Sequence, residues 1–351
     1  MTVVILFGAS GDICRKKVYP ALYSIYSKNN NYFNKIIGYG RSDLKLSQLY
    51  EKININDDKF LNLFTYQQGQ YNSFDDFKKL KNLIDNNINP DKKIIIYFGV
   101  PSVVFCDIVK NIYLTHIEND YSCKYLFEKP IGYDFNSCKI ILNLLSNFVE
   151  EKNINIIDHY LGKNKLIQLS KTKKENLKSI KIILNEKEDV NHRIQYFNDV
   201  GIFKDMIQSH VMSILFYCFS DNFKIDTKNY PKIISCNRGQ YNGYNGSNNV
   251  GTFIKLELRW NEIDILIISG KGMEEDIKEV SYADNFGTFK YKINSKESEY
   301  INLFDDICER NTTDKFLSKK KVLYFWKISE NILDNISNIK INKYDIPKND
   351  Y

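Results

Sequence analysis

The chain has 351 residues, a length that suggests about two domains of ordinary size. Apolar residues make up 43% of the chain, yet no apolar run is long enough to span a membrane, so we expect a soluble, cytoplasmic protein without membrane partners. The net charge of +6 is spread along the chain and forms no basic block, which argues against nucleic-acid binding.

Strands and helices alternate in the first half of the chain. Continuous apolar runs, typical of strands buried on both faces, predict strands at Val3–Phe7, Ile36–Gly40 and Ile94–Val100. Two further short strands fall in CKYLFEKP and INIIDHY, and helical patterns cover Arg15–Lys28, Phe74–Asn86 and Asn136–Glu151. This alternation predicts a Rossmann-like, doubly wound parallel sheet, which we assign to residues 1–158.

The pattern changes after Leu161. Strand-like stretches at Ile180–Asn185, Thr252–Trp260 and Ile263–Ser269 surround a helix at Asp205–Cys218, and a long helical tail covers Thr313–Asn338. Because consecutive strands are joined by turns as short as WNE, we expect residues 159–351 to form an α+β domain on a largely antiparallel sheet backed by helices.

The seven cysteines predict neither disulfides nor a metal site. They are odd in number, and none forms a CxxC pair or a cluster with histidine at zinc spacing. We therefore expect reduced thiols and no metal.

The segment GASGDI, Gly8–Ile13, stands where the first strand turns into a helix. Backbone N–H groups at such a turn point at anions, which favours a dinucleotide pyrophosphate near Gly8, Ser10, Gly11 and Asp12. The match to GxGxxG is loose, because Ser10 and Ile13 occupy the second and third glycine positions.

The second strand ends in Gly40, Arg41 and Ser42, where an NAD enzyme usually places an acidic residue for the ribose hydroxyls. Arg41 can instead form a bidentate pair with a 2′-phosphate, and Ser42 can donate a hydrogen bond. We expect NADP as the cofactor, with NAD as a weaker alternative.

Two groups of polar residues follow later strands. Lys129 comes directly after a strand, at the carboxyl edge of the sheet where ligands bind. Asp158, His159, Tyr160 and Lys163 follow the next strand and bring an imidazole, a phenol and an ammonium together, the donors that a phosphate monoester needs.

His210 lies in the amphipathic stretch YFNDVGIFKDMIQSHVMSILF. Oxidation of a sugar hydroxyl by hydride transfer needs a base near neutrality, which a histidine can supply, with a carboxylate to fix its tautomer. Asp205 is five residues away, an awkward spacing on an α-helix, so spacing alone leaves Asp158 equally eligible as the partner.

Several of these motifs, in this order, resemble the glucose-6-phosphate dehydrogenase family. They are GASGD, GYGRS, GQY, EKPIG, IDHYLGK, YFNDVGIFKDMIQSH and SGKGMEEDIKEV. The resemblance covers about Val3–Ser337 and implies NADP-dependent oxidation of glucose 6-phosphate at C1 to 6-phosphogluconolactone, the first step of the oxidative pentose phosphate pathway.

The resemblance also implies a role for each residue. His210 corresponds to the general base and Asp158 to the carboxylate that pairs with it. His159, Tyr160 and Lys163 correspond to the phosphate cradle. Sugar ligands are implied at Asp205, Glu186, Lys271 and Lys129, and cofactor contacts at Gly8, Ser10, Gly11, Asp12, Arg41, Ser42, Pro101 and Lys129.

The chain also departs from the family pattern. Ile156 and Asp276 stand where the family usually has arginine, and NHRIQYF keeps Arg193 without its flanking glycines. The chain is considerably shorter than typical members, with losses between Tyr291 and Tyr300 and at the C-terminus. The family's second sheet forms a homodimer interface, so this shortening leaves dimerisation open, and we expect no second, structural NADP site.

Two alternative functions stay open. A carboxylate at Glu186 can hold an ammonium as well as a hydroxyl, so the same chemistry could act on another hexose 6-phosphate such as glucosamine 6-phosphate. A catalytically silent paralogue that binds NADP or sugar phosphate is the other alternative, although His210, Asp158 and Lys129 are all retained.

Overall fold

The computed structural model describes residues 2–86, 93–293 and 299–345, without the side chains of 119 and 120. The chain divides into two compact units. The first contains Met1–Gly162 and Glu297–Lys320, and the second contains Lys163–Lys296 and Lys321–Tyr351. The expected boundary after residue 158 lies near the point where the chain leaves the first unit, but the return of Glu297–Lys320 to that unit was not expected. The shortened region between Tyr291 and Tyr300 falls partly outside the described residues.

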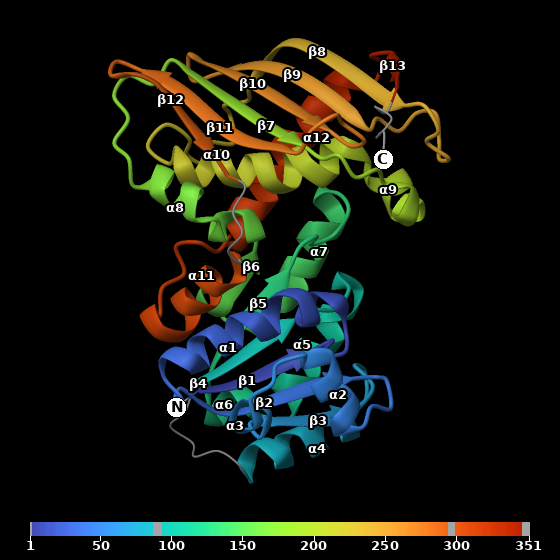
Figure 1. Ribbon diagram of the computed structural model, residues 1–351, viewed down its shortest axis with the longest axis vertical. Coiled ribbons are helices and arrows are strands. Elements are labelled where there is room, and N and C mark those ends of the chain that lie inside the picture. Colours follow the sequence, from blue (N-terminus) through green and yellow to red (C-terminus); the bar gives the residue numbers. More distant parts are fainter. Residues whose placement is uncertain (1, 87–92, 294–298, 346–351) are drawn as a thin grey trace. The chain divides into compact units, whose positions relative to one another are not determined.

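The first unit is built on a parallel sheet with the strand order β3-β2-β1-β4-β5-β6 (Figure 1). This is the order of a dinucleotide-binding fold. Its strands are β1 (Thr2–Phe7), β2 (Phe33–Gly40), β3 (Phe64–Gln68), β4 (Lys93–Phe98), β5 (Ser122–Glu128) and β6 (Ile154–Ile157). Every residue of β1 is buried, as its continuous apolar run predicts for a central parallel strand.

Helices and short helical turns connect these strands. They are η1 (Cys14–Val18), α1 (Tyr19–Lys28), α2 (Leu46–Ile53), α3 (Asp58–Leu61), α4 (Phe74–Asp85), η2 (Ser102–Val104), α5 (Phe105–Leu114), α6 (Ile117–Asp120), α7 (Phe135–Ser146), η3 (Glu151–Asn153) and η4 (His159–Gly162). The helices predicted over Arg15–Lys28 and Phe74–Asn86 are thus confirmed within a few residues.

The returning segment completes one face of this unit. It forms α11 (Glu299–Asp305) and η7 (Asp306–Arg310). Tyr300, Leu303 and Phe304 join the core cluster that also contains Leu22 and Ile25 of α1. Leu317 then forms an antiparallel bridge to Ile156 of β6. Residues from far along the sequence therefore close the first core.

The second unit is a mixed, mostly antiparallel sheet with the order β12-β11-β7-β10-β9-β8-β13. Its strands are β7 (Ser179–Asn185), β8 (Lys232–Tyr241), β9 (Phe253–Trp260), β10 (Ile263–Gly270), β11 (Ile277–Asp284), β12 (Gly287–Lys292) and β13 (Ile341–Tyr344). Two pairs, β7 with β10 and β8 with β13, are parallel. Four strands, β8, β11, β12 and β13, were missed in the sequence.

Helices of the second unit pack on one face of its sheet (Figure 1). They are α8 (Asn164–Ser170), η5 (Asn191–Arg193), α9 (Ile194–Ile202), η6 (Phe203–Val211), α10 (Met212–Cys218) and α12 (Lys319–Ile336). Phe216 of α10 contacts the rings of Trp260 in β9 and Tyr324 in α12. β10 alternates between buried and more exposed residues, as a strand with one covered face does.

All seven cysteines are free thiols. Among the described residues, no helix is both long and apolar enough to cross a membrane.

Candidate active site

The turn after β1 fits a dinucleotide phosphate. Gly8 has φ +81°, and a Cβ there would lie 2.3 Å from the carbonyl oxygen of Gly99, so only glycine fits this close approach of two strand ends. Gly11 donates its N–H to the Gly8 carbonyl at 2.9 Å, and no side chain caps the start of η1. Uncapped N–H groups at a helix start are suited to an anion.

Asp12 adds a carboxylate to this turn, but two cations compensate it. Arg15 and Lys16 approach it at 3.2 and 3.3 Å, and hydrogen bonds from Lys16 and Arg15 lower the pKa of Asp12. The first helical turn therefore carries a net positive charge. Ser10 lies within the turn and is half-buried.

Arg41 and Ser42 are exposed directly after β2. The Arg41 guanidinium lies 5.6 Å from the ring centre of Tyr71, and in the part of the chain that the structure describes no carboxylate lies within ion-pair distance of it. The Ser42 carbonyl accepts a hydrogen bond from the Tyr66 hydroxyl at 2.9 Å. Pro101 is exposed after β4, at the same edge of the sheet.

Lys129 and Asp158 form a buried ion pair at this edge. β5 and β6 pair with Glu128 opposite Ile157, so the residues that follow them are neighbours. Lys129 Nζ lies 3.0 Å from Asp158 Oδ2, with the side chains 11% and 0% exposed. Oδ1 of Asp158 accepts the Tyr160 N–H at 3.0 Å, and the peptide bond between Lys129 and Pro130 is cis. The carboxylate is thus held from both sides.

Glu128 is a buried acid that sequence reasoning passed over, although it stands in the EKPIG motif. Its Oε1 accepts hydrogen bonds from the hydroxyls of Tyr97 and Tyr300, each at 2.8 Å. Burial raises the pKa of Glu128 to about 7, although the two phenols lower it and Asp158 raises it further. Near neutrality this acid is therefore partly uncharged beside the Lys129–Asp158 pair.

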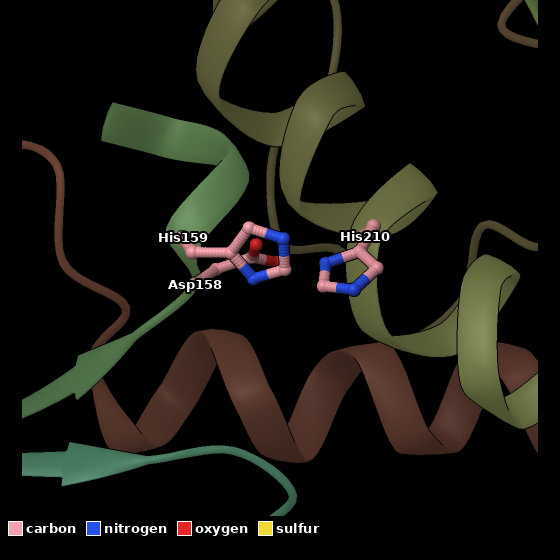
Figure 2. A group of neighbouring side chains, drawn as sticks. All are labelled: Asp158, His159 and His210. Carbon is pink, nitrogen blue, oxygen red and sulfur yellow. The ribbon is translucent and has the colours of Figure 1, made fainter. Parts of the chain in front are cut away.

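The IDHYLGK segment contains both functional candidates and structural residues. His159 is half-buried and Tyr160 buried, with ring centres 4.9 Å apart. Figure 2 shows His159 at the start of η4, just after β6. A Cβ at Gly162 would lie 2.2 Å from the Glu299 carbonyl oxygen, so this glycine serves the packing of the returning segment. Lys163 is buried and begins the second unit.

In the second unit, the parallel pairing of β7 with β10 brings Glu186 and Lys271 together. Gly270 lies opposite Asn185, so the next residue of each strand emerges at the same edge. Lys271 is 2% exposed, and its Nζ lies 2.5 Å from Glu186 Oε2 and 2.9 Å from Asp205 Oδ2. One buried ammonium therefore holds two carboxylates.

Two further cations flank these carboxylates. Lys278 Nζ lies 3.5 Å from Glu186 Oε1, and Arg193 lies 3.9 Å from Asp205. Burial would raise the pKa of Glu186, but Lys271, Lys278 and Arg193 outweigh that effect and lower it to about 2. Glu186 is therefore ionised at neutral pH. Arg193 and Lys278 had no predicted site role, and nothing in the local sequence points to Lys278.

His210 and Asp205 share a π-helical segment, η6, which begins after a kink at Gly201 with φ +59°. Its N–H groups bond five residues back, as Met212 does to Ile207. In such a helix, residues five apart lie on successive turns of the same face. The five-residue spacing between Asp205 and His210 is therefore no argument against their pairing, as it would be on an α-helix. His210 is half-buried on this helix (Figure 2).

The two arginine replacements have structural explanations. Ile156 is fully buried in β6 and forms the bridge to Leu317. An apolar side chain suits this buried position. Asp276 Oδ1 accepts the N–H of Lys187 at 3.0 Å, so this carboxylate fixes the backbone directly after Glu186.

Family models match the chain on both sides of the unit boundary. Residues 5–168 match the model described as glucose-6-phosphate dehydrogenase, NAD binding domain, and residues 163–223 match that of the C-terminal domain of the same enzyme. The chain belongs to the glucose-6-phosphate dehydrogenase family. The family resemblance of the motifs is thereby confirmed, together with the Rossmann-like and mainly antiparallel fold classes.

Relatives within the glucose-6-phosphate dehydrogenase family differ in how much of their length is matched. The glucose-6-phosphate 1-dehydrogenase of Kluyveromyces lactis is 30% identical over 243 residues, which cover 61% of this chain and 49% of the relative. That of Helicobacter pylori is 28% identical over 284 residues, covering 70% and 64%. The chain thus spans about half the length of the first of these.

A solved structure matches the fold over almost the whole chain. It is a glucose-6-phosphate dehydrogenase in complex with its substrate glucose 6-phosphate, with a TM-score of 0.84 at 21% identity. The match covers 99% of this chain and 95% of that chain. A protein of similar length thus has the same fold.

Proposed function

We propose that this chain oxidises glucose 6-phosphate at C1 to 6-phosphogluconolactone with NADP as hydride acceptor. The observation that carries the proposal is the family match over residues 5–223. This part of the chain contains most of the polar residues to which the family resemblance gives a role. The experiment is a direct assay of the dehydrogenase reaction.

His210 is the proposed general base. It takes the proton of the C1 hydroxyl while the C1 hydrogen leaves as hydride, so the C1–O bond becomes the carbonyl of the lactone. Histidine is the side chain that most often serves as a general base in enzymes. When bound, NADP supplies the nicotinamide ring that accepts the hydride. Pairing of Asp158 with His210 stays a prediction.

The phosphate and hydroxyl ligands are proposed at the positions that the family resemblance implies. His159, Tyr160 and Lys163 supply the donors for the phosphate. Glu186 and Asp205 accept hydrogen bonds from sugar hydroxyls, since Lys271 contacts both carboxylates and holds them in place. These groups need no rearrangement to present acceptors to vicinal hydroxyls, which lowers the entropic cost of binding.

The cofactor preference is proposed from Arg41 and Ser42. A guanidinium stacked on Tyr71 and without a carboxylate partner among the described residues is available to a 2′-phosphate. The two residues directly after β2 are Arg41 and Ser42, where an NAD enzyme usually has an acidic residue for the ribose hydroxyls, so NAD is the weaker cofactor.

The charges around Glu186 favour a hydroxyl over an amino group in the substrate. Glu186 already contacts two ammonium groups, from Lys271 and Lys278. The ammonium of glucosamine 6-phosphate would add a third cation at the same carboxylate. Repulsion between like charges a few ångströms apart would then oppose binding.

The test measures initial rates of reduced-cofactor formation with glucose 6-phosphate and glucosamine 6-phosphate, each with NADP and with NAD. We expect turnover of glucose 6-phosphate with NADP, and a loss of roughly 10²- to 10⁴-fold in kcat for His210→Asn, which keeps a polar side chain without the base. His192→Asn, an exposed histidine, is the matched control and should keep the wild-type rate.

Other outcomes would redirect the assignment. Activity with the amino sugar alone would move the function to a dehydrogenase of another hexose 6-phosphate. A folded protein that binds NADP but turns over neither sugar with either cofactor would be a silent paralogue. Sedimentation of the same preparation would test the homodimer, which stays a prediction.

A further inference from the structure

A cavity lies in the first unit, at the amino ends of the parallel strands. Its volume is about 890 Å³. Its walls include Lys93, Tyr113, Lys124, Phe148, Asn153 and Asn311. The Gly8 turn lies at the carboxyl ends of the same strands, which are separated from the amino ends by roughly 20 Å over the six residues of β4. The cavity is therefore distinct from the proposed cofactor site.

Two lysines meet on one face of the sheet in this cavity. Lys93 of β4 pairs with Ser122 of β5, and Lys124 lies two residues further along β5, so their side chains project from the same face. Lys93 Nζ donates to the Ile307 carbonyl and, at 3.0 Å, to Asn311 Oδ1. Lys124 Nζ donates to Asn153 Oδ1 at 3.1 Å. All of these acceptors are neutral.

Among the described residues, no counter-ion compensates these two charges. Within the described part of the chain, no carboxylate lies within ion-pair distance of Lys93 or Lys124. Cys308 also lines the cavity, but burial raises the pKa of its thiol to about 12, so it stays neutral. Burial lowers the pKa of Lys93, Cys308 raises it, and the charge of Lys124 lowers it, with a net lowering. Two half-buried ammonium groups of like charge thus lie in the same cavity.

The carboxylates that line the cavity already have donors. Glu118 accepts a hydrogen bond from the Tyr125 hydroxyl, and Glu150 forms a 2.6 Å ion pair with Lys152 at the exposed rim. Asn153 and Asn311 use their carbonyl oxygens for the lysines, which leaves their NH₂ groups as donors toward the cavity. The cavity therefore offers two ammonium and two amide groups to an anion.

We propose that this cavity binds a small phosphate-bearing anion between Lys93 and Lys124. A phosphate would neutralise both ammonium groups at once and accept the amide donors. The ring pair of Tyr113 and Phe148, with centres 5.4 Å apart, offers an apolar wall for the body of a phosphate ester. The site is separate from the proposed phosphate cradle at His159, Tyr160 and Lys163.

The test follows the acylation of each lysine by an amine-reactive ester, resolved by peptide mass spectrometry, with inorganic phosphate as the probe. At a phosphate concentration ten times Kd, acylation of Lys93 and Lys124 should slow about tenfold, because the unbound fraction is 1/(1 + [phosphate]/Kd). Lys78, an exposed lysine that pairs with Asp75 and does not line the cavity, is the control and should keep its rate. Sodium chloride of equal ionic strength is the control for screening.

Variants make the test reciprocal. In Lys93→Met, phosphate should no longer protect Lys124, and in Lys124→Met it should no longer protect Lys93. The control variant Lys78→Met, away from the cavity, should keep both lysines protected. Equal protection by chloride, no protection in the wild-type chain, or protection that survives in both lysine variants would each overturn the proposal. Because the readout is specific to these lysines, binding of phosphate at Lys163 or loss of the dehydrogenase activity leaves the result unaffected.

Discussion

The two units hold the charges of their candidate site residues in different ways. In the first, Lys129 and Asp158 follow adjacent strands and form one pair at 3.0 Å. In the second, Lys271 is shared by Glu186 and Asp205, and the three residues come from β10, β7 and a π-helix. The first arrangement depends on one strand pairing. The second depends on a parallel pairing between distant strands and on the helix type, so it is more sensitive to the loss of its central residue.

The largest effect is expected from Lys271→Met. It leaves the carboxylates of Glu186 and Asp205 close together without their shared cation, so the second unit should lose about 3–5 kcal/mol of unfolding free energy. Both tryptophans, Trp260 and Trp326, lie in this unit, so tryptophan fluorescence in urea reports on it.

Arg259→Met is the matched control for Lys271→Met. Arg259 pairs with Asp264 at 2.7 Å, but these side chains are 49% and 59% exposed, so its loss should cost less than about 1 kcal/mol. Equal losses in the two variants would show that Lys271 does not organise the cluster.

A smaller loss, roughly 3 kcal/mol, is expected for Lys129→Met in the first unit. Only one carboxylate loses its cation here, and Asp158 keeps the N–H of Tyr160. Hydrogen exchange of peptides covering β5 and β6 measures the change. Lys78→Met, which removes an exposed pair with Asp75, is the control and should leave exchange unchanged. A loss larger than that of Lys271→Met would reverse the comparison between the units.

The two acids should respond to pH in opposite directions. The pKa of Glu186 is about 2 in the folded chain, below the unfolded value of about 4.3. The stabilisation that ionised Glu186 adds to the unfolding free energy is therefore present above pH 4.3 and lost as pH falls toward 2. The pKa of Glu128 is raised to about 7. The stabilisation that protonated Glu128 adds to the unfolding free energy is therefore present below pH 4.3 and lost as pH rises through 7.

Glu128→Gln tests this opposition. Glutamine keeps an acceptor for Tyr97 and Tyr300 without titrating, so the variant should gain about 2.5 kcal/mol relative to the wild type as pH rises from 5 to 8. Glu51→Gln, an exposed position, should show no such gain. Unfolding in urea at a series of pH values gives both curves, and parallel curves for wild type and Glu128→Gln would refute the raised pKa.

The smallest effect concerns the turn between β9 and β10, where Asn261 and Glu262 both have positive φ, 51° and 62°. A non-glycine residue in this conformation costs roughly 1 kcal/mol, so Glu262→Gly should stabilise the second unit by about that amount. Asn261→Gly should gain less, since asparagine tolerates this region and Asn261 donates to the Asn222 carbonyl. Thermal unfolding by tryptophan fluorescence distinguishes the two variants.

Much of the first unit could be predicted from the sequence. Its central strands are buried on both faces and therefore appear as continuous apolar runs, and its candidate residues stand directly after those runs, as Lys129 and Asp158 do. The carboxyl ends of parallel strands share one edge, so order along the chain was enough to group them.

The second unit could be predicted only in outline. Nothing in the local sequence shows that β7 pairs with β10, so the meeting of Glu186 with Lys271 depends on sheet register. The π-helical turns of η6 also escape an analysis that assumes α-helical spacing, which is why Asp205 and His210 seemed badly placed. Glu128 was missed because its neighbours Tyr97 and Tyr300 are far away in sequence.

The return of Glu297–Lys320 to the first unit affects the timing of folding during synthesis. A ribosome-bound chain that has emerged as far as β10 contains all six strands of the parallel sheet but lacks Leu303, Phe304 and Ile307, which complete the core beside α1. Nascent domains usually fold in order from the N-terminus. Here the N-terminal unit must wait, with one apolar face uncovered, until most of the second unit has been translated.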